Sequence, residues 1–317
     1  MNEAAPSDIT GERIEGMLAT ALGPVAGDYL RDDSVLELML NADGKLWIDR
    51  LGEGRSFTGH IISSHDAERV VFIVASSTKS SCSKDSPIIS AELPGSGSRF
   101  QGMLPPVVRA PIFTIRKKAI KVFTLSDYVQ RGILKEHYAK TLMGAVRLRK
   151  NILIAGGTGS GKTTLANAIL QEISKTGDRL IVIEDKIELQ PSAADCVCLR
   201  TKEGVSTMTD LLKATMRLRP DRIIIGEVRG PEALALLKSW NTGHPGGCAT
   251  IHADSARKAL SRLSQLIEEA SVKASSALIA DAVNLIVFIE KTKTSRVVSE
   301  ILEVGWNGVD YALSECA

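Results

Sequence analysis

One stretch of the sequence decides the fold: Gly156-Gly157-Thr158-Gly159-Ser160-Gly161-Lys162-Thr163. It satisfies the phosphate-binding pattern G-x-x-x-x-G-K-[ST] in full. The glycines allow backbone conformations with positive φ, which turn successive N–H groups toward a single anion. Apolar residues 152–154 lead into the loop and a helical pattern over 163–173 leaves it, which is the context that phosphate binding needs. The sequence therefore predicts a P-loop that binds ATP.

Each part of this loop has an expected contact. Lys162 supplies a mobile cation for the β- and γ-phosphates, and the Thr163 hydroxyl is placed to coordinate Mg²⁺. The following helix adds the partial positive charge of its N-terminus. The expected nucleotide ligands are therefore the eight residues of the motif and Thr164. A glycine-rich turn without a ligand is the alternative, and the flanking strand and helix disfavour it.

Elsewhere the chain divides into two predicted domains. Residues 1–122 read as a small α+β domain, 123–135 as a linker and 136–317 as an α/β domain in which strand and helix patterns alternate, typical of a mostly parallel sheet. In the first domain, strands are expected at 36–40 and 45–49 around the turn Asn41-Ala42-Asp43-Gly44, and another at 113–115. A helix is expected over 66–75, with Ser64 as its cap. Residues 87–106, rich in Pro, Gly and Ser, are expected to be loop with short strands at most.

Composition limits the partners and the compartment. The 39 basic and 37 acidic residues give a net charge of only +2, and aromatic residues are 4% of the chain, which disfavours direct nucleic-acid binding. Five scattered cysteines describe neither a disulfide framework nor a zinc site. The most apolar stretch, 277–289, contains Asp281 and Asn284 and is too short to span a bilayer. We therefore expect a cytosolic protein that reaches a membrane only through its partners.

Hydrolysis also needs a carboxylate that orients water and helps to hold the metal. Glu227 lies just past the apolar strand at 223–225, and Glu184 and Asp185 follow the strand at 180–183, with Glu188 a few residues on. In open α/β sheets, ligands bind at the carboxyl ends of the strands. Both Glu184 and Glu227 are therefore candidates for catalysis and for binding the metal together with Thr163.

Histidines and arginines complete the set of candidates. His252 in Thr250-Ile251-His252 is a candidate sensor of the γ-phosphate, and His244 is a weaker one. Their spacing matches no helical metal pair. Phosphoryl transfer also rewards a guanidinium placed against the γ-phosphate. The candidate arginines are Arg116, Arg200, Arg217 and Arg219, although the last two could simply complement a helix C-terminus.

Taken together, these boxes resemble the secretion superfamily of traffic ATPases, which power type II and type IV secretion and type IV pili. The P-loop is followed by Ile183-Glu184-Asp185 with Glu188, by the run from Arg219 to Gly230, and by Thr242-Gly243-His244 and Thr250-Ile251-His252-Ala253. Residues 35–47, 87–99 and 113–117 resemble the short N-terminal domain of the type IV secretion branch, most closely conjugal-transfer ATPases of the Trb type. Lys186 departs from the small or proline residue that many relatives have there.

The resemblance implies a RecA-like ATPase domain and a homohexameric ring with nucleotide held between the two domains. It also implies that Lys162 and Thr163 bind phosphate and Mg²⁺, that Glu184 and Glu227 share metal and water positioning, and that His252 senses the γ-phosphate. The four candidate arginines would contact nucleotide from either domain or from a neighbouring subunit. Inner-membrane components of a secretion or conjugation apparatus would be the partners, and the protein would be cytoplasmic.

Three other functions stay open on the sequence alone. A small-molecule P-loop kinase is disfavoured because the chain has a separate N-terminal domain and no obvious acceptor-binding lid. An ATP-dependent scaffold or switch with negligible turnover would carry the same P-loop, although Glu227 and His252 favour turnover. A DNA-tracking motor is disfavoured by the balanced charge and the few aromatic residues.

Overall fold

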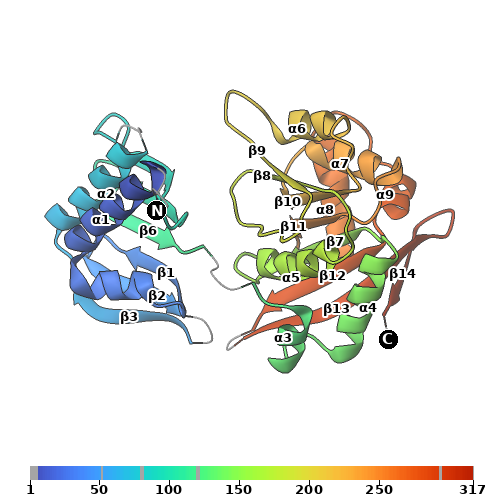
Figure 1. Cartoon of the computed structure of the whole chain (residues 1–317), viewed down its shortest axis with the longest axis horizontal. Helices are drawn as coiled ribbons and strands as arrows, with labels where there is room; N and C mark the ends of the chain where they lie inside the picture. The colour runs from blue at the N-terminus through green and yellow to red at the C-terminus, as the bar shows by residue number, and fades with distance from the viewer. Residues whose placement is uncertain (1–5, 51–52, 79–81, 119–121, 293–294, 317) are drawn as a thin grey trace, which may run out of the picture. The chain divides into compact units, whose positions relative to one another are not determined.

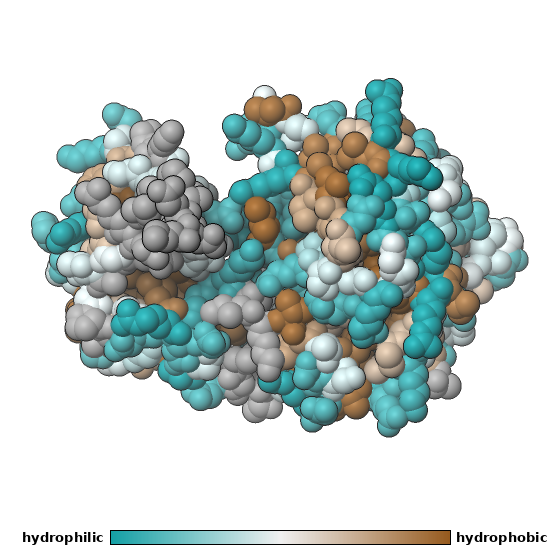
Figure 2. All heavy atoms as spheres, in the orientation of Figure 1, coloured by the Kyte–Doolittle hydropathy of each residue, from teal (hydrophilic) through white to brown (hydrophobic). Residues whose placement is uncertain are grey.

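The chain folds into two compact units, Met1–Ile120 and Lys121–Ala317, each with its own sheet and core. The computed structural model describes residues 6–50, 53–78, 82–118, 122–292 and 295–316. On the face drawn in Figure 2, hydrophobic residues form scattered islands among hydrophilic ones. Within the described ranges, no helix has the length and hydropathy needed to cross a membrane.

The first unit is a six-stranded antiparallel sheet with strand order β3-β2-β1-β6-β5-β4. Its strands are β1 (Val35–Leu40), β2 (Lys45–Arg50), β3 (Gly54–Ile61), β4 (Ile88–Glu92), β5 (Arg99–Met103) and β6 (Ile112–Arg116). Helices α1 (Pro6–Arg31) and α2 (Ser64–Ser77) lie side by side (Figure 1). Val70 and Val74 of α2 pack with Leu38 and Ile115 of the sheet to form the core of this unit.

The hairpin predicted for the first unit is found, whereas its helices differ in part from the prediction. The expected hairpin is present as β1 and β2. Helix α2 is capped by Ser63 and not by Ser64, since the Ser63 Oγ accepts the Asp66 N–H at 3.1 Å. Helix α1 was not predicted from the sequence, and it is interrupted at Gly23, whose φ is 77°.

The second unit contains an eight-stranded sheet with strand order β14-β13-β12-β7-β11-β10-β8-β9. The run from β12 to β9 is parallel, and β13 and β14 extend it as antiparallel strands. The strands are β7 (Ile152–Gly156), β8 (Leu180–Glu184), β9 (Cys196–Arg200), β10 (Arg222–Val228), β11 (Cys248–His252), β12 (Leu285–Lys291), β13 (Arg296–Trp306) and β14 (Tyr311–Glu315). The α/β fold predicted for this part of the chain is confirmed.

Helices cover both faces of this sheet (Figure 1), because the strand side chains alternate between two apolar layers. Ile152 and Ile154 of β7 pack in the layer formed with α3, α4 and α5, whereas Leu153 and Ala155 pack in the layer formed with α7, α8 and α9. The helices are α3 (Leu125–Gln130), α4 (Glu136–Arg147), α5 (Lys162–Ser174), α6 (Met208–Thr215), α7 (Glu232–Asn241), α8 (Ala256–Glu268) and α9 (Ser276–Ala282).

Residues 123–135, expected to be a linker, contain helix α3. The helix is closed by a capping box in which Thr124 and Asp127 bond each other's backbone N–H groups. Leu125, Tyr128 and Leu134 are buried in the same apolar layer as α4 and α5. This segment is therefore folded as part of the second unit.

Candidate functional site

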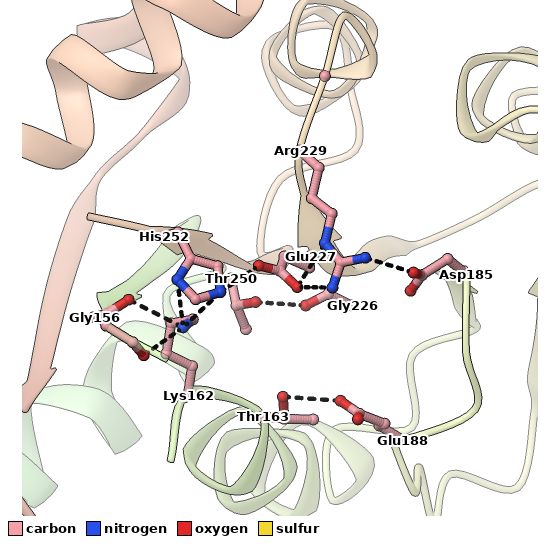
Figure 3. Close-up of polar contacts among 12 residues, drawn as sticks. Gly156, Lys162, Thr163, Asp185, Glu188, Gly226, Glu227, Arg229, Thr250 and His252 are labelled. Carbon is pink, nitrogen blue, oxygen red and sulfur yellow. Dashed lines mark hydrogen bonds and ion pairs between the residues drawn. The ribbon is translucent and has the colours of Figure 1, made fainter. Parts of the chain in front are cut away.

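The predicted carboxylates and His252 meet the P-loop at one edge of the second sheet. Strands β7, β8, β10 and β11 are parallel, so the residues at their carboxyl ends share that edge. His252, the last residue of β11, pairs with Gly156, the first residue of the loop. Glu227 lies within β10, which is longer than the strand that the sequence predicted. Figure 3 shows this cluster.

Two residues of the predicted phosphate-binding loop have backbone conformations that favour glycine. Gly159 and Gly161 have φ values of 70° and 98°, a region that favours glycine. A Cβ on Gly156 would lie 2.2 Å from the carbonyl oxygen of Ile289 and 2.6 Å from the Ser160 Oγ. The Ser160 hydroxyl is buried and has no hydrogen-bond partner among the described residues. The first glycine of the loop thus packs tightly against β12.

Lys162 is folded back over this loop. Its side chain donates from Nζ to the carbonyl oxygens of Gly156 at 3.0 Å and Gly157 at 2.9 Å. The residue is only 7% exposed, and its Nζ lies 3.4 Å from the His252 Nε2. A buried ammonium needs such oxygen partners, and phosphate oxygens are of the same kind. The cation is therefore held at the loop by two carbonyl oxygens, beside the His252 ring.

Glu227 and His252 extend this chain of contacts. The Glu227 Oε1 lies 3.0 Å from the His252 Nε2, and the Glu227 side chain is 14% exposed. Burial, followed by the positive charge of Lys162, lowers the pKa of His252. The imidazole is therefore favoured in its neutral form, and the Glu227 Oε1 beside it is buried without a hydrogen bond among the described residues. A cation, a neutral imidazole and a carboxylate thus lie in series beside the P-loop (Figure 3).

The acidic box forms a second branch of the site. Glu184 is 5% exposed, and its Oε1 accepts the N–H groups of Glu188 at 3.1 Å and Leu189 at 2.9 Å. Glu188, which the sequence did not place among the ligands, accepts a hydrogen bond from the Thr163 Oγ1 at 3.2 Å. Gly226 lies against Glu184, whose Cγ would be 3.0 Å from a Cβ at that position. In this branch, Glu188 therefore supplies the carboxylate that contacts the Thr163 hydroxyl.

Burial raises the pKa of Glu184 to about 7 from its ordinary value of 4.5, so the stability of the unit should depend on pH. Between these two values the folded state binds more protons than the unfolded state, and stability falls as pH rises. Glu184→Gln keeps an oxygen for the two N–H groups but cannot ionise. Between pH 5 and pH 8, urea unfolding should show the wild-type protein losing about 1–3 kcal/mol relative to the variant. Parallel pH profiles for the two proteins would contradict this.

Arg229 was missed by the sequence analysis, although it lies two residues beyond Glu227. Its Nε donates to the Glu227 Oε2 at 2.8 Å, and its Nη1 donates to the Asp185 Oδ2 at 2.7 Å. Arg200, a predicted nucleotide ligand, is also near the acidic box, and its Nε lies 3.4 Å from the Asp185 carbonyl oxygen. Adjacency to Glu227 was the one sequence signal that could have found Arg229.

The other predicted arginines lie elsewhere. Arg217 and Arg219 precede β10 and are exposed at the amino edge of the sheet, opposite the P-loop. His244, near the same edge, has its Nδ1 2.9 Å from the Pro220 carbonyl oxygen. The structure therefore does not bring these three residues to the loop of their own chain.

In the first unit, Arg116 ends β6 and lies directly opposite Arg99 of β5. The Arg116 Nε is 3.6 Å from a carboxylate oxygen of Glu37. Arg116, a predicted nucleotide ligand, is therefore close to a carboxylate of its own unit.

Known proteins are similar to this chain over most of its length. The family of type II/IV secretion system proteins matches residues 84–299. A probable conjugal transfer protein TrbB of Sinorhizobium fredii (strain NBRC 101917 / NGR234) is 50% identical over 294 residues, covering 92% of this chain and 90% of that protein. The type IV secretion system protein VirB11 of Bartonella henselae is 31% identical over 293 residues, covering 80% and 82% of the two chains.

Among solved structures, the VirB11 ATPase of the Brucella suis type IV secretion system, in complex with sulphate, is 27% identical to this chain. The two structures match with a TM-score of 0.50, over 93% of this chain and 97% of that one. The sequence match and the structural match both extend over most of this chain and most of each relative. The chain therefore belongs to the family of type II/IV secretion system proteins, as its P-loop, acidic box and histidine box predicted.

Proposed function

We propose that this protein hydrolyses ATP to energise type IV secretion, in conjugal transfer, pilus assembly or substrate translocation. The observation that carries the proposal is the series of contacts from Lys162 through His252 to Glu227 beside the P-loop. A P-loop by itself explains binding. A carboxylate held near the phosphate-binding cation adds a group that can orient water for hydrolysis.

In the proposed reaction, Lys162 exchanges its two carbonyl contacts for oxygens of the β- and γ-phosphates, and neutral His252 lies beside the γ-phosphate. Glu227 orients the attacking water and receives its proton. The structure favours Glu227 over Glu184 as the general base. Glu184 is tied to two backbone N–H groups, whereas Glu227 lies beside His252 and so next to Lys162.

Mg²⁺ would find two suitable oxygens side by side in the Thr163 hydroxyl and the Glu188 carboxylate. Hydroxyl and carboxylate oxygens are the ligands that this ion prefers, and the Thr163 hydroxyl already contacts the Glu188 carboxylate. We propose that Thr163 holds the ion with help from Glu184, Glu188 and Glu227. When bound, Mg²⁺ neutralises phosphate charge and stabilises the charge that develops during phosphoryl transfer.

The purified protein is expected to release phosphate from ATP in the presence of Mg²⁺. Chelation of the ion with EDTA should lower the rate by at least about 100-fold, because its charge stabilisation contributes several kcal/mol. The measurement is steady-state phosphate release at saturating ATP, with excess Mg²⁺ restored after EDTA as the control. A rate that EDTA leaves unchanged, or tight ATP binding without any turnover, would contradict the proposal.

We further propose that the working form is a homohexamer in the cytoplasm, held at the inner membrane by other components of the secretion apparatus. The support is that the relatives named above are components of conjugal transfer and type IV secretion systems. In a ring, Arg217 and Arg219 would reach the nucleotide of a neighbouring subunit, which is consistent with their distance from the P-loop edge of their own chain. Arg116 and Arg200 would contact phosphate as further cations.

A second function, an ATP-dependent switch with negligible turnover, is favoured by one contact. Glu227 is paired with Arg229, and an ion pair of this kind could restrain a carboxylate that has to act on water. The effect of removing Arg229 therefore bears directly on the choice between the two functions.

A further inference from the structure

The side chain of Arg229 joins two motifs that are far apart in the sequence. Its Nε and Nη2 both contact the Glu227 Oε2, and its Nη1 donates to the Asp185 Oδ2 (Figure 3). A guanidinium offers donors in a rigid planar fork, so it can hold two carboxylates in a fixed relation. The side chain of Arg229 is 53% exposed, whereas that of Glu227 is only 14% exposed. The ion pair thus fixes a mostly buried carboxylate from its solvent side.

The position of Arg229 explains why it can reach both motifs. Strands β8 and β10 are parallel neighbours, with Ile183 paired to Ile225. The acidic box lies at the carboxyl end of β8, and Glu227 lies near the carboxyl end of β10. Both are therefore at the same edge of the sheet. The acidic loop continues to Glu188, which contacts the Thr163 hydroxyl of the P-loop helix. Arg229 therefore connects the carboxylate beside His252 with the loop that reaches Thr163.

Arg229 thus holds Glu227 through one oxygen, Oε2. The other oxygen, Oε1, lies 3.0 Å from the His252 Nε2 and is buried without a hydrogen bond among the described residues. We propose that Arg229 is a positioning residue for hydrolysis, which keeps Glu227 directed at His252 and the acidic loop in place; this rests on the ATPase function proposed above. Neither the P-loop motif nor Glu227 by itself would indicate this role for Arg229.

Loss of the guanidinium has a defined consequence. Asp185 and Glu227 would be left near each other without the cation that lies between them, and like charges repel at such separations. Glu227 would also lose the contact that fixes Oε2, so its Oε1 would no longer be held toward His252. The contacts of Lys162 with the loop would remain. The chemical step should therefore suffer more than nucleotide binding does.

Kinetics of three variants test the proposal. In Arg229→Gln, kcat for ATP hydrolysis is expected to fall about 10- to 100-fold, while KM changes by less than about threefold. The kcat of Arg229→Lys should lie between those of Arg229→Gln and the wild type, because an ammonium restores the charge but not the planar fork of donors. The matched control is Arg147→Gln, which removes an exposed arginine in the last turn of α4 and should keep the wild-type kcat. Thermal unfolding should show that every variant is folded.

Two kinetic outcomes would overturn the proposal. If Arg229→Gln keeps the wild-type kcat, or loses activity only through a higher KM, Arg229 does not position the chemical step. If kcat rises in Arg229→Gln, the ion pair restrains Glu227 and the role of Arg229 is the reverse of the one proposed. A merely structural arginine would not give a selective loss of kcat that lysine partly restores.

A second readout does not depend on turnover. Spectra of ¹³C-labelled histidine, recorded at one fixed pH and assigned with His252→Gln, report the surroundings of the His252 ring. The His252 signal is expected to move in Arg229→Gln and to stay in place in Arg147→Gln. An unmoved signal in Arg229→Gln would overturn the proposal. If the wild-type protein does not hydrolyse ATP, the proposed function fails, and this signal still decides whether Arg229 holds Glu227 against His252.

Discussion

The Glu227→Gln protein is expected to bind ATP and to hydrolyse it about 100- to 10,000-fold more slowly than the wild-type protein. Glutamine has nearly the same shape, and its amide oxygen can still face Arg229 or His252. It cannot accept a proton from water as a carboxylate does. Because Lys162 and the loop are untouched, the dissociation constant for ATP should stay within about threefold. Steady-state phosphate release at saturating ATP, together with a binding titration, measures both quantities.

The control for this substitution is Glu268→Gln, which removes an exposed carboxylate at the end of α8. It should leave both hydrolysis and binding at wild-type values. If Glu227→Gln hydrolyses ATP at the wild-type rate, Glu227 is not the general base, and Glu184 takes its place as the candidate. If ATP binding is lost along with turnover, the effect on chemistry cannot be separated from damage to the site, and the assignment fails.

The Gly156→Ala protein is expected to lose ATP binding and to unfold at a lower urea concentration. An added Cβ would lie 2.2 Å from the Ile289 carbonyl oxygen, which is backbone and cannot rotate away. Ile289 belongs to β12, whose pairing with β13 and β7 fixes that carbonyl. The loop or the strand would have to shift, and overpacking of this kind costs about 1–3 kcal/mol.

The same loop provides a matched control for this effect. A Cβ on Gly157 would meet nothing within 4 Å, and its φ is not in the positive region that favours glycine. Gly157→Ala should therefore keep its free energy of unfolding within about 0.5 kcal/mol of the wild-type value. Equal urea midpoints for the two alanine variants would show that the packing of Gly156 against β12 does not constrain the loop.

Local patterns predicted the parts of the fold that depend on neighbouring residues. The P-loop, its strand β7 and its helix α5 could be placed because their glycines and apolar runs act over a few residues. The association of 123–135 with the second unit could not be predicted locally, because it depends on Leu125 and Tyr128 packing against residues far away in the sequence. The cap of α2 was displaced by one residue because two adjacent serines are equally good caps.

The site was predictable where its residues end parallel strands, since those ends meet at one edge. His252 and Glu184 follow this rule, and so does Glu227 although its strand is longer than expected. Arg217 and Arg219 precede β10 and so lie at the opposite edge of the sheet. The direction of the chain would have been enough to infer this. The contacts of Arg229 with Asp185 and of Glu188 with Thr163 could not be predicted. They depend on which strands are neighbours and on the rotamers of long side chains.

The most direct test of the account is a structure of Glu227→Gln with ATP and Mg²⁺ bound. The account predicts that the Lys162 Nζ leaves the carbonyl oxygens of Gly156 and Gly157 and contacts the γ-phosphate, with His252 and residue 227 beside that phosphate. A nucleotide bound with Lys162 still on the two carbonyls, or with its γ-phosphate away from His252 and residue 227, would contradict the account.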